Sequence, residues 1–121
     1  MRLFNSNMKT ALYTKPIEEL KTEALVIGCY SDTLDDLDNY ESICNGLIHE
    51  VVFDKEFIGK LNQIINLRLT GNVKRILLLG LGKREEFNVK KAREATGKAV
   101  LYLRDQKVKE FSFCLFNDLQ P

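Results

Sequence analysis

The chain has 121 residues, of which 45% are hydrophobic, and this is enough for one domain with a single core but short for two. Its 18 basic and 17 acidic residues give a formal net charge of +1, so overall charge favours neither a nucleic acid nor a membrane as a partner. The charges are segregated, however. Residues 1–54 hold 4 Lys/Arg and 10 Asp/Glu, whereas residues 55–121 hold 14 and 7.

The three cysteines, Cys29, Cys44 and Cys114, are odd in number, widely spaced and set in apolar surroundings, with no Cys-x-x-Cys pair. This pattern favours reduced, buried thiols over a metal or redox site. The amino terminus has no apolar run of signal-peptide length, and no apolar stretch is long enough to cross a bilayer. We therefore expect a soluble cytoplasmic protein that has no membrane partner.

The first half of the chain predicts two strands and a helix. Residues 8–14 alternate loosely before Lys15-Pro16 and indicate a short peripheral strand. Residues 24–30 are continuously apolar, as in a central strand that is buried on both faces. Apolar residues then recur at three- and four-residue intervals behind an acidic first turn, which predicts one helix over about 35–48.

The second half predicts a hairpin, a helix and a last strand. Residues 64–69 and 73–79 read as two strands joined by a tight turn at Gly71-Asn72. A helix should begin after the N-cap Asn88 and run to about residue 106, and residues 111–116 should form another strand. The predicted apolar stripe of that helix consists of Val89, Ala92, Thr96, Ala99, Val100 and Leu103.

Strand, helix and strand follow one another twice, which predicts an α/β fold over residues 1–121. The sheet should be mixed and largely parallel, because the hairpin adds an antiparallel pair. Helices should flank it.

A glycine-bearing loop, Gly80, Gly82 and Lys83, follows one predicted strand and is a candidate ligand loop. Dinucleotide loops require a third glycine where this chain has Glu85, and the Gly-Lys-Ser/Thr ending of a P-loop is also absent. A structural turn, in which glycine relieves backbone strain, is the better reading.

A second candidate is a basic contact face around the last helix, formed by Arg84, Lys90, Lys91 and Lys98. Such a face could meet nucleic acid or an acidic partner. Nearby acidic residues and the lack of interleaved stacking aromatics favour a solvated helix face instead.

The single histidine, His49, is predicted at the carboxyl end of the first helix, where the helix dipole favours a positive side chain. The sequence shows no His, Cys or carboxylate cluster with ligand spacing around it. The aspartates at 32, 35, 36 and 38 lack the glycine and terminal glutamate of a calcium loop, so a solvated helix start is expected there. We therefore predict no catalytic residue, no metal ligand and no cofactor in this chain.

One longer pattern combines an apolar strand ending in Gly-x-Gly-Lys, an acidic turn and a helix containing Arg-x-Ala-x-Gly-Lys-Ala. It comprises residues 74–87 followed by Val89, Arg93, Ala95, Gly97, Lys98 and Ala99. In this order the pattern resembles the amino-terminal domain of the cytosolic leucyl aminopeptidase family, peptidase family M17. Residues 22–28 look like the first core strand of that family, and Phe57-Ile58-Gly59-Lys60 looks like its approach to the next strand.

The resemblance implies a macro-domain-like fold and a supporting role in a larger enzyme. In that family a separate carboxy-terminal domain holds two divalent metals (Zn or Mn) and removes amino-terminal residues from peptides, and the chains form hexamers. The family's metal-binding motif Asn-Thr-Asp-Ala-Glu-Gly-Arg has no counterpart here, so the catalytic domain is absent from residues 1–121. The expected partners are that domain and further copies of the chain, and some members contact DNA. A stand-alone macro-like binding module and a nucleic-acid-contacting domain remain the alternatives.

Overall fold

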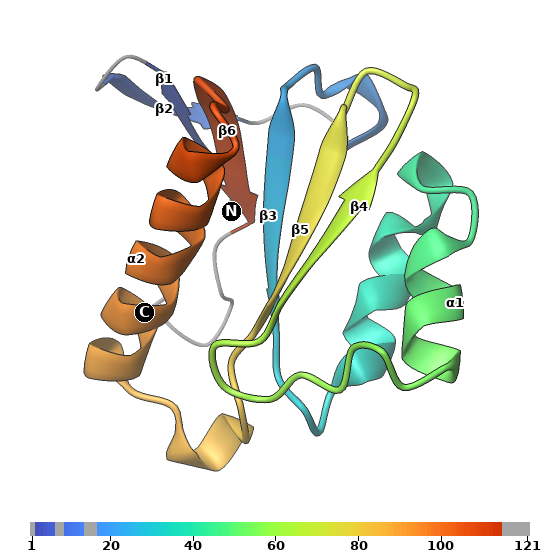
Figure 1. The fold of residues 1–121 in the computed structure, drawn as a ribbon, viewed down its shortest axis with the longest axis vertical. Helices are drawn as coiled ribbons and strands as arrows, with labels where there is room; N and C mark the ends of the chain where they lie inside the picture. Colours follow the sequence, from blue (N-terminus) through green and yellow to red (C-terminus); the bar gives the residue numbers. More distant parts are fainter. Residues whose placement is uncertain (1, 7–8, 14–16, 115–121) are drawn as a thin grey trace.

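The computed structural model describes residues 2–6, 9–13 and 17–114, and they form a mixed β-sheet between two helical layers (Figure 1). The strands are β1 (Arg2–Ser6), β2 (Lys9–Tyr13), β3 (Ala24–Cys29), β4 (Ile64–Arg68), β5 (Arg75–Gly80) and β6 (Glu110–Cys114). The helical segments are the 3-10 helices η1 (Ile17–Glu19), η2 (Leu34–Ile43) and η3 (Arg84–Glu86), and the α-helices α1 (Leu47–Phe53) and α2 (Val89–Asp105).

The six strands lie in the order β2-β1-β6-β3-β5-β4. β3 pairs in parallel with both β5 and β6, so the centre of the sheet is parallel. The outer pairs, β1 with β2, β1 with β6 and β4 with β5, are antiparallel. This arrangement confirms the predicted mixed α/β sheet, the central position of residues 24–29 and the peripheral position of residues 9–13. The sheet is less parallel than predicted, because three of the five pairs among the described strands are antiparallel.

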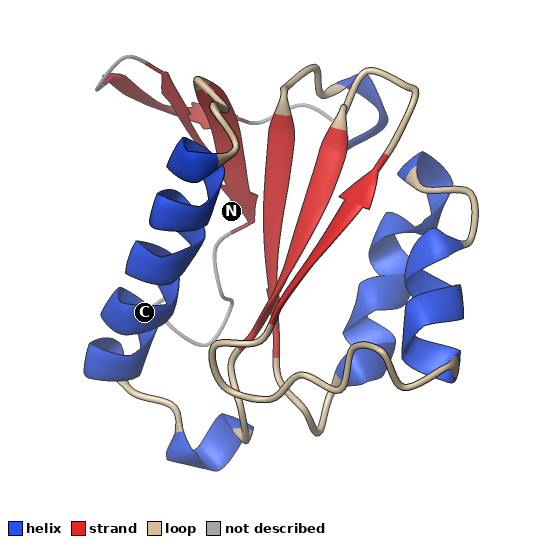
Figure 2. Cartoon of the chain, in the orientation of Figure 1, coloured by secondary structure: helices blue, strands red, loops and turns tan. Residues whose placement is uncertain are grey.

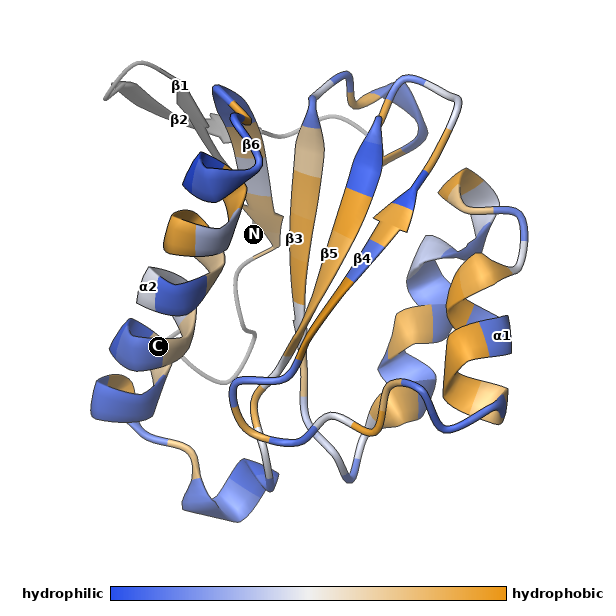
Figure 3. Ribbon diagram, viewed as in Figure 1, coloured by the Kyte–Doolittle hydropathy of each residue, from blue (hydrophilic) through white to orange (hydrophobic). Residues whose placement is uncertain are grey.

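Helices cover both faces of the central strands, and the side chains on both faces of these strands are apolar (Figure 2). On one side, α2 packs Ala95, Ala99 and Leu103 against Val26 and Leu77. On the other side, η2 and α1 supply a second core; its members include Leu25, Ile27, Leu37, Ile48, Val51, Ile76 and Leu78. Figure 3 shows the same division, with hydrophobic strands inside and hydrophilic residues on the outer side of α2.

The predicted single helix over 35–48 is wrong. Residues 34–43 form the 3-10 helix η2, the chain reverses at Asn45 and Gly46, whose φ angles are 52° and 83°, and α1 begins at Leu47. Two consecutive residues in the left-handed region cannot continue a helix. The apolar spacing was real, because Leu37, Cys44 and Ile48 are all buried, but two helical segments provide it.

Two further predictions need adjustment. The β4–β5 connection runs over Leu69–Lys74, so it extends beyond the predicted turn at Gly71-Asn72. The N–H of Leu69 donates to the carbonyl of Lys74 at 2.9 Å and closes it, and Val73 pairs with Thr22. In α2, Val89 is 62% exposed and does not belong to the apolar stripe, while Ala95 is fully buried in it. The predicted strand residues 115 and 116 lie outside the described part of the chain.

The amino-terminal strand β1 was not predicted. It pairs with β6 and places the β1–β2 hairpin beside it, so β6 lies inside the sheet and not at its edge. An uncovered β6 would present unpaired N–H and C=O groups to other chains.

Within the described part of the chain, no helix is long and apolar enough to span a membrane.

Candidate functional site

The glycine-bearing loop lies where β3 and β5 end, and three chain segments meet there. The N–H of Gly82 donates to the carbonyl of Gly59 at 2.8 Å, and the N–H of Ser31 donates to the carbonyl of Gly82 at 2.9 Å. The N–H of Gly80 donates to Gln63 O at 2.8 Å. The amides that would bind a phosphate at Gly80 and Gly82 are therefore bonded within the fold.

Close packing explains why glycines occupy this loop. A Cβ atom on Gly80 would lie 1.9 Å from the carbonyl oxygen of Lys60, and one on Gly59 would lie 2.7 Å from Cα of Ser31. Lys83 is exposed beside this junction. Ligand binding by Gly80, Gly82 and Lys83 stays a prediction, and the contacts give the two glycines a packing role.

The residues of the predicted basic face run from Arg84 in η3 to Lys98 near the middle of α2. Asn88 caps this helix as predicted, since its side chain accepts a hydrogen bond from Lys91 N at 2.9 Å. Lys90 and Lys98 are exposed, whereas Lys91 is half-buried and its Nζ donates to Glu86 O at 2.9 Å. Arg84 is also exposed, and its backbone N–H donates to Asp32 Oδ1 at 3.2 Å. Contact of this face with nucleic acid stays a prediction.

His49 does not lie at the carboxyl end of a helix, contrary to the prediction. It is in the first turn of α1 and is exposed, where the helix dipole does not favour a positive charge. The fold also brings it next to Asp38 and Glu41 of η2, so that one potential ligand atom from each of the three side chains lies within 4.8 Å of the others. The cluster was not predicted, because the apolar spacing predicts one continuous helix over residues 35–48 and no reversal of the chain within it.

The three cysteines are buried thiols that form no disulfide, as predicted. Burial is the main reason that the pKa of the Cys29 thiol rises from 9.0 to about 12, and the charges of Asp36, Asp35 and Asp32 raise it further. Burial also raises the pKa of Cys44. Thiols held protonated in this way are poor nucleophiles and poor metal ligands.

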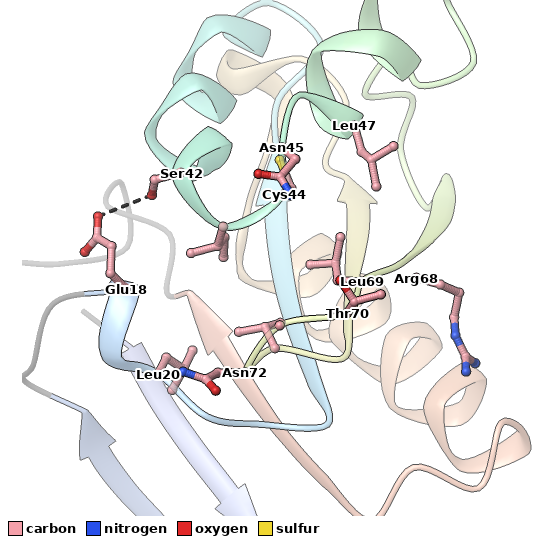
Figure 4. A pocket seen from close by; sticks show the side chains of 13 residues that line it. Glu18, Leu20, Ser42, Cys44, Asn45, Leu47, Arg68, Leu69, Thr70 and Asn72 are labelled. Atoms are coloured by element: carbon pink, nitrogen blue, oxygen red, sulfur yellow. Dashed lines mark hydrogen bonds between the residues drawn. The ribbon is translucent and has the colours of Figure 1, made fainter.

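A pocket of about 520 Å³ lies between the η1–η2 side of the fold and the β4–β5 connection (Figure 4). Glu18 and Ser42 face each other at its rim, and the Ser42 hydroxyl donates to Glu18 Oε1 at 3.2 Å. Asn72 lines it from the β4–β5 connection, and Leu20 and Leu69 add apolar surface. Residues 68–73 of the pocket lining come directly before β5, and the glycine loop comes directly after β5. The pocket and the glycine loop therefore lie at opposite ends of that strand. No sequence pattern pointed to this pocket, because its lining comes from three separated segments, 18–20, 42–47 and 68–73.

Residues 26–118 match the family described as "Cytosol aminopeptidase family, N-terminal domain". The chain belongs to this family. A "Probable cytosol aminopeptidase" from Trichormus variabilis is 33% identical over 119 residues, which is 92% of this chain and 24% of the relative. Another protein of that name, from Geotalea uraniireducens, is 39% identical over 98 residues, covering 75% of this chain and 19% of the relative.

The fold agrees with this membership of the cytosol aminopeptidase family. A mutant leucine aminopeptidase from tomato has a TM-score of 0.65 and 22% identity, covering 79% of this chain and 20% of the tomato chain. The resemblance seen in residues 74–99 and the predicted mixed α/β fold are thus confirmed. The chain spans about a quarter or less of the length of these relatives.

Proposed function

We propose that this chain is the non-catalytic amino-terminal domain of a longer aminopeptidase, where it supports assembly of the enzyme and regulates access to its active site. The observation that carries the proposal is the family match over residues 26–118, which is to an amino-terminal domain, together with the small share of each relative that the chain covers. The partners would be the catalytic domain of the same polypeptide and further copies, six in the complete enzyme.

The residues of this chain do not fit the catalytic metals of such an enzyme. The motif Asn-Thr-Asp-Ala-Glu-Gly-Arg is missing from the sequence. Two divalent ions, Zn²⁺ or Mn²⁺, would belong to the catalytic domain, so no step of peptide hydrolysis is assigned to residues of this chain. Its contribution would be made through its surfaces.

The first experiment is to read the coding DNA beyond the codon for Pro121. Continuation into a segment with the metal-binding motif is expected. A stop codon directly after Pro121 would overturn the proposal and leave an independent small protein.

The assembly role is tested on the complete polypeptide. Its mass by sedimentation and its hydrolysis of a leucyl anilide in the presence of Zn²⁺ or Mn²⁺ are compared with those of a version that lacks residues 1–121. Deletion should reduce the number of subunits in the oligomer, calculated from its mass, and should change the Michaelis constant for longer peptides. An unchanged number of subunits together with unchanged kinetics would contradict the role.

A second candidate function, a small-molecule binding module, is supported by the pocket beside Glu18, Ser42 and Asn72. Its size and its mixed polar and apolar lining suit a small polar ligand. Binding of a nucleotide such as ADP-ribose should then perturb NMR signals of residues 68–73. Perturbation at residues 80–83 would instead favour the glycine loop, and no perturbation would exclude this ligand class.

A further inference from the structure

Three side chains of metal-ligand type gather on the helical layer that does not contain α2. Asp38 and Glu41 come from η2, and His49 comes from α1. One imidazole nitrogen and one oxygen from each carboxylate all lie within 4.8 Å of one another. The cluster lies outside the glycine loop and outside the basic face.

The local geometry of the chain produces this cluster. A 3-10 helix has three residues per turn, so Asp38 and Glu41 stand one above the other on η2. The reversal at residues 44–46 brings α1 back against η2. Ile48 packs into the core and fixes the rotation of α1, and this leaves the neighbouring His49 on the outside of the helix.

The half-buried side chain of Glu41 provides a second observation. Its Oε2 accepts a hydrogen bond from the Cys44 thiol at 3.4 Å, which orients the carboxylate. Its Oε1 is buried and has no hydrogen-bond partner within the described part of the chain. A buried carboxylate oxygen without a partner is costly, and a cation bound at Oε1 would remove that cost.

We propose that Asp38, Glu41 and His49 bind a divalent transition-metal ion of the zinc class. One imidazole and two carboxylates are ligands that Zn²⁺ accepts, whereas Mg²⁺ and Ca²⁺ prefer oxygen ligands alone. Ligand atoms about 2.1 Å from one Zn²⁺ ion lie roughly 3.4 Å apart in tetrahedral geometry. The exposed side chains of Asp38 and His49 reach this spacing by changes of rotamer, and water fills the open position.

The bound ion would act as a clamp between η2 and α1. It links residues on both sides of the reversal at Asn45 and Gly46, which is itself closed by the turn hydrogen bonds from Cys44 N to Glu41 O and from Leu47 N to Cys44 O. The Cys44 thiol would serve as a positioning group, because it holds Glu41 in place by its hydrogen bond. This site is independent of the peptidase role and of the metals of a catalytic domain.

The test is a calorimetric titration of the whole 121-residue chain with ZnCl₂, using His49→Gln and Asp38→Asn as the site variants. Both side chains are exposed, so neither change should disturb folding. Each is expected to weaken Zn²⁺ binding by more than about 10-fold. The matched control is Asp35→Asn, which removes an exposed carboxylate of the same helix that is not in the cluster and should leave the affinity unchanged within about 2-fold.

The single histidine makes a direct readout possible. Only one set of imidazole signals exists in the NMR spectrum, and Zn²⁺ should shift it while a large excess of Mg²⁺ should not. Equal Zn²⁺ affinity in the wild-type chain and His49→Gln would overturn the proposal. An imidazole signal that does not respond to Zn²⁺ would overturn it as well.

Discussion

Replacing Gly80 by alanine tests the junction at which β5 meets the segment before β4. The added Cβ would lie 1.9 Å from the carbonyl oxygen of Lys60 and 2.8 Å from the carbonyl carbon of Gly59. Both are backbone atoms, so no flexible side chain can move aside. The strand and residues 59–60 must separate.

The size of the effect follows from the bonds that this separation breaks. The N–H of Gly80 donates to Gln63 O, and its carbonyl accepts from Asn62 N, both at 2.8 Å. Overpacking costs about 1–3 kcal/mol, and each lost backbone hydrogen bond costs on the order of 1 kcal/mol. Gly80→Ala should therefore lower the free energy of unfolding by about 3–5 kcal/mol, which corresponds to a fall of roughly 10–20 °C in Tm.

Urea unfolding followed by far-ultraviolet circular dichroism is the suitable assay, because the chain contains no tryptophan. Gly97→Ala is the matched control: Gly97 lies inside α2, and a Cβ there would meet nothing within 4 Å. That change should raise stability by about 0.5–1 kcal/mol, since alanine favours the helix. If Gly80→Ala were as stable as the wild-type chain within about 0.5 kcal/mol, the close approach at this junction would be refuted.

Three further changes probe a cap, a buried cation and a buried thiol. Asn88→Ala removes the side-chain acceptor of the α2 cap and should cost about 1 kcal/mol of stability in urea, so an unchanged midpoint would contradict the capping role. Arg75→Met should raise the free energy of unfolding by about 1–2 kcal/mol, because Nη1 of this buried residue has no partner among the described residues; a lower free energy of unfolding would show that the charge is compensated. The raised pKa of Cys29 means that the unfolded thiol ionises first, so stability should fall between pH 9 and about 12, by at most about 1.4 kcal/mol per pH unit. Cys29→Ala should lose this part of the pH dependence, and an equal slope in both proteins would exclude the thiol as its source.

The elements best predicted from the sequence are those whose signal is local. The apolar run at residues 24–29 and the apolar run of β5 correspond to strands that helices cover on both faces. Asn88 marks the start of α2 because a side-chain cap depends only on the residues that follow it. The family resemblance rests on this same region.

The features that escaped prediction depend on contacts between distant residues. β1 is a strand because β6 and β2 pair with it, and its own sequence has too few apolar residues to signal this. The break between η2 and α1 depends on Asn45 as well as Gly46 being in the left-handed region, which the apolar spacing conceals. The cluster of Asp38, Glu41 and His49 could be found only after this break was known.

The fold places helices of the acidic first half and of the basic second half of the sequence on opposite faces of the sheet. The acidic first half supplies η2, whose exposed residues include Asp35 and Asp36, and the basic second half supplies α2, whose exposed residues include Lys90 and Lys98. These two helices cover opposite faces of the sheet, so the charge imbalance runs across the domain (Figure 1). Opposite faces therefore favour partners of opposite charge, and salt should weaken contacts at both. The acidic face is also the one with the Asp38, Glu41 and His49 cluster, where surrounding negative charge would attract a divalent cation.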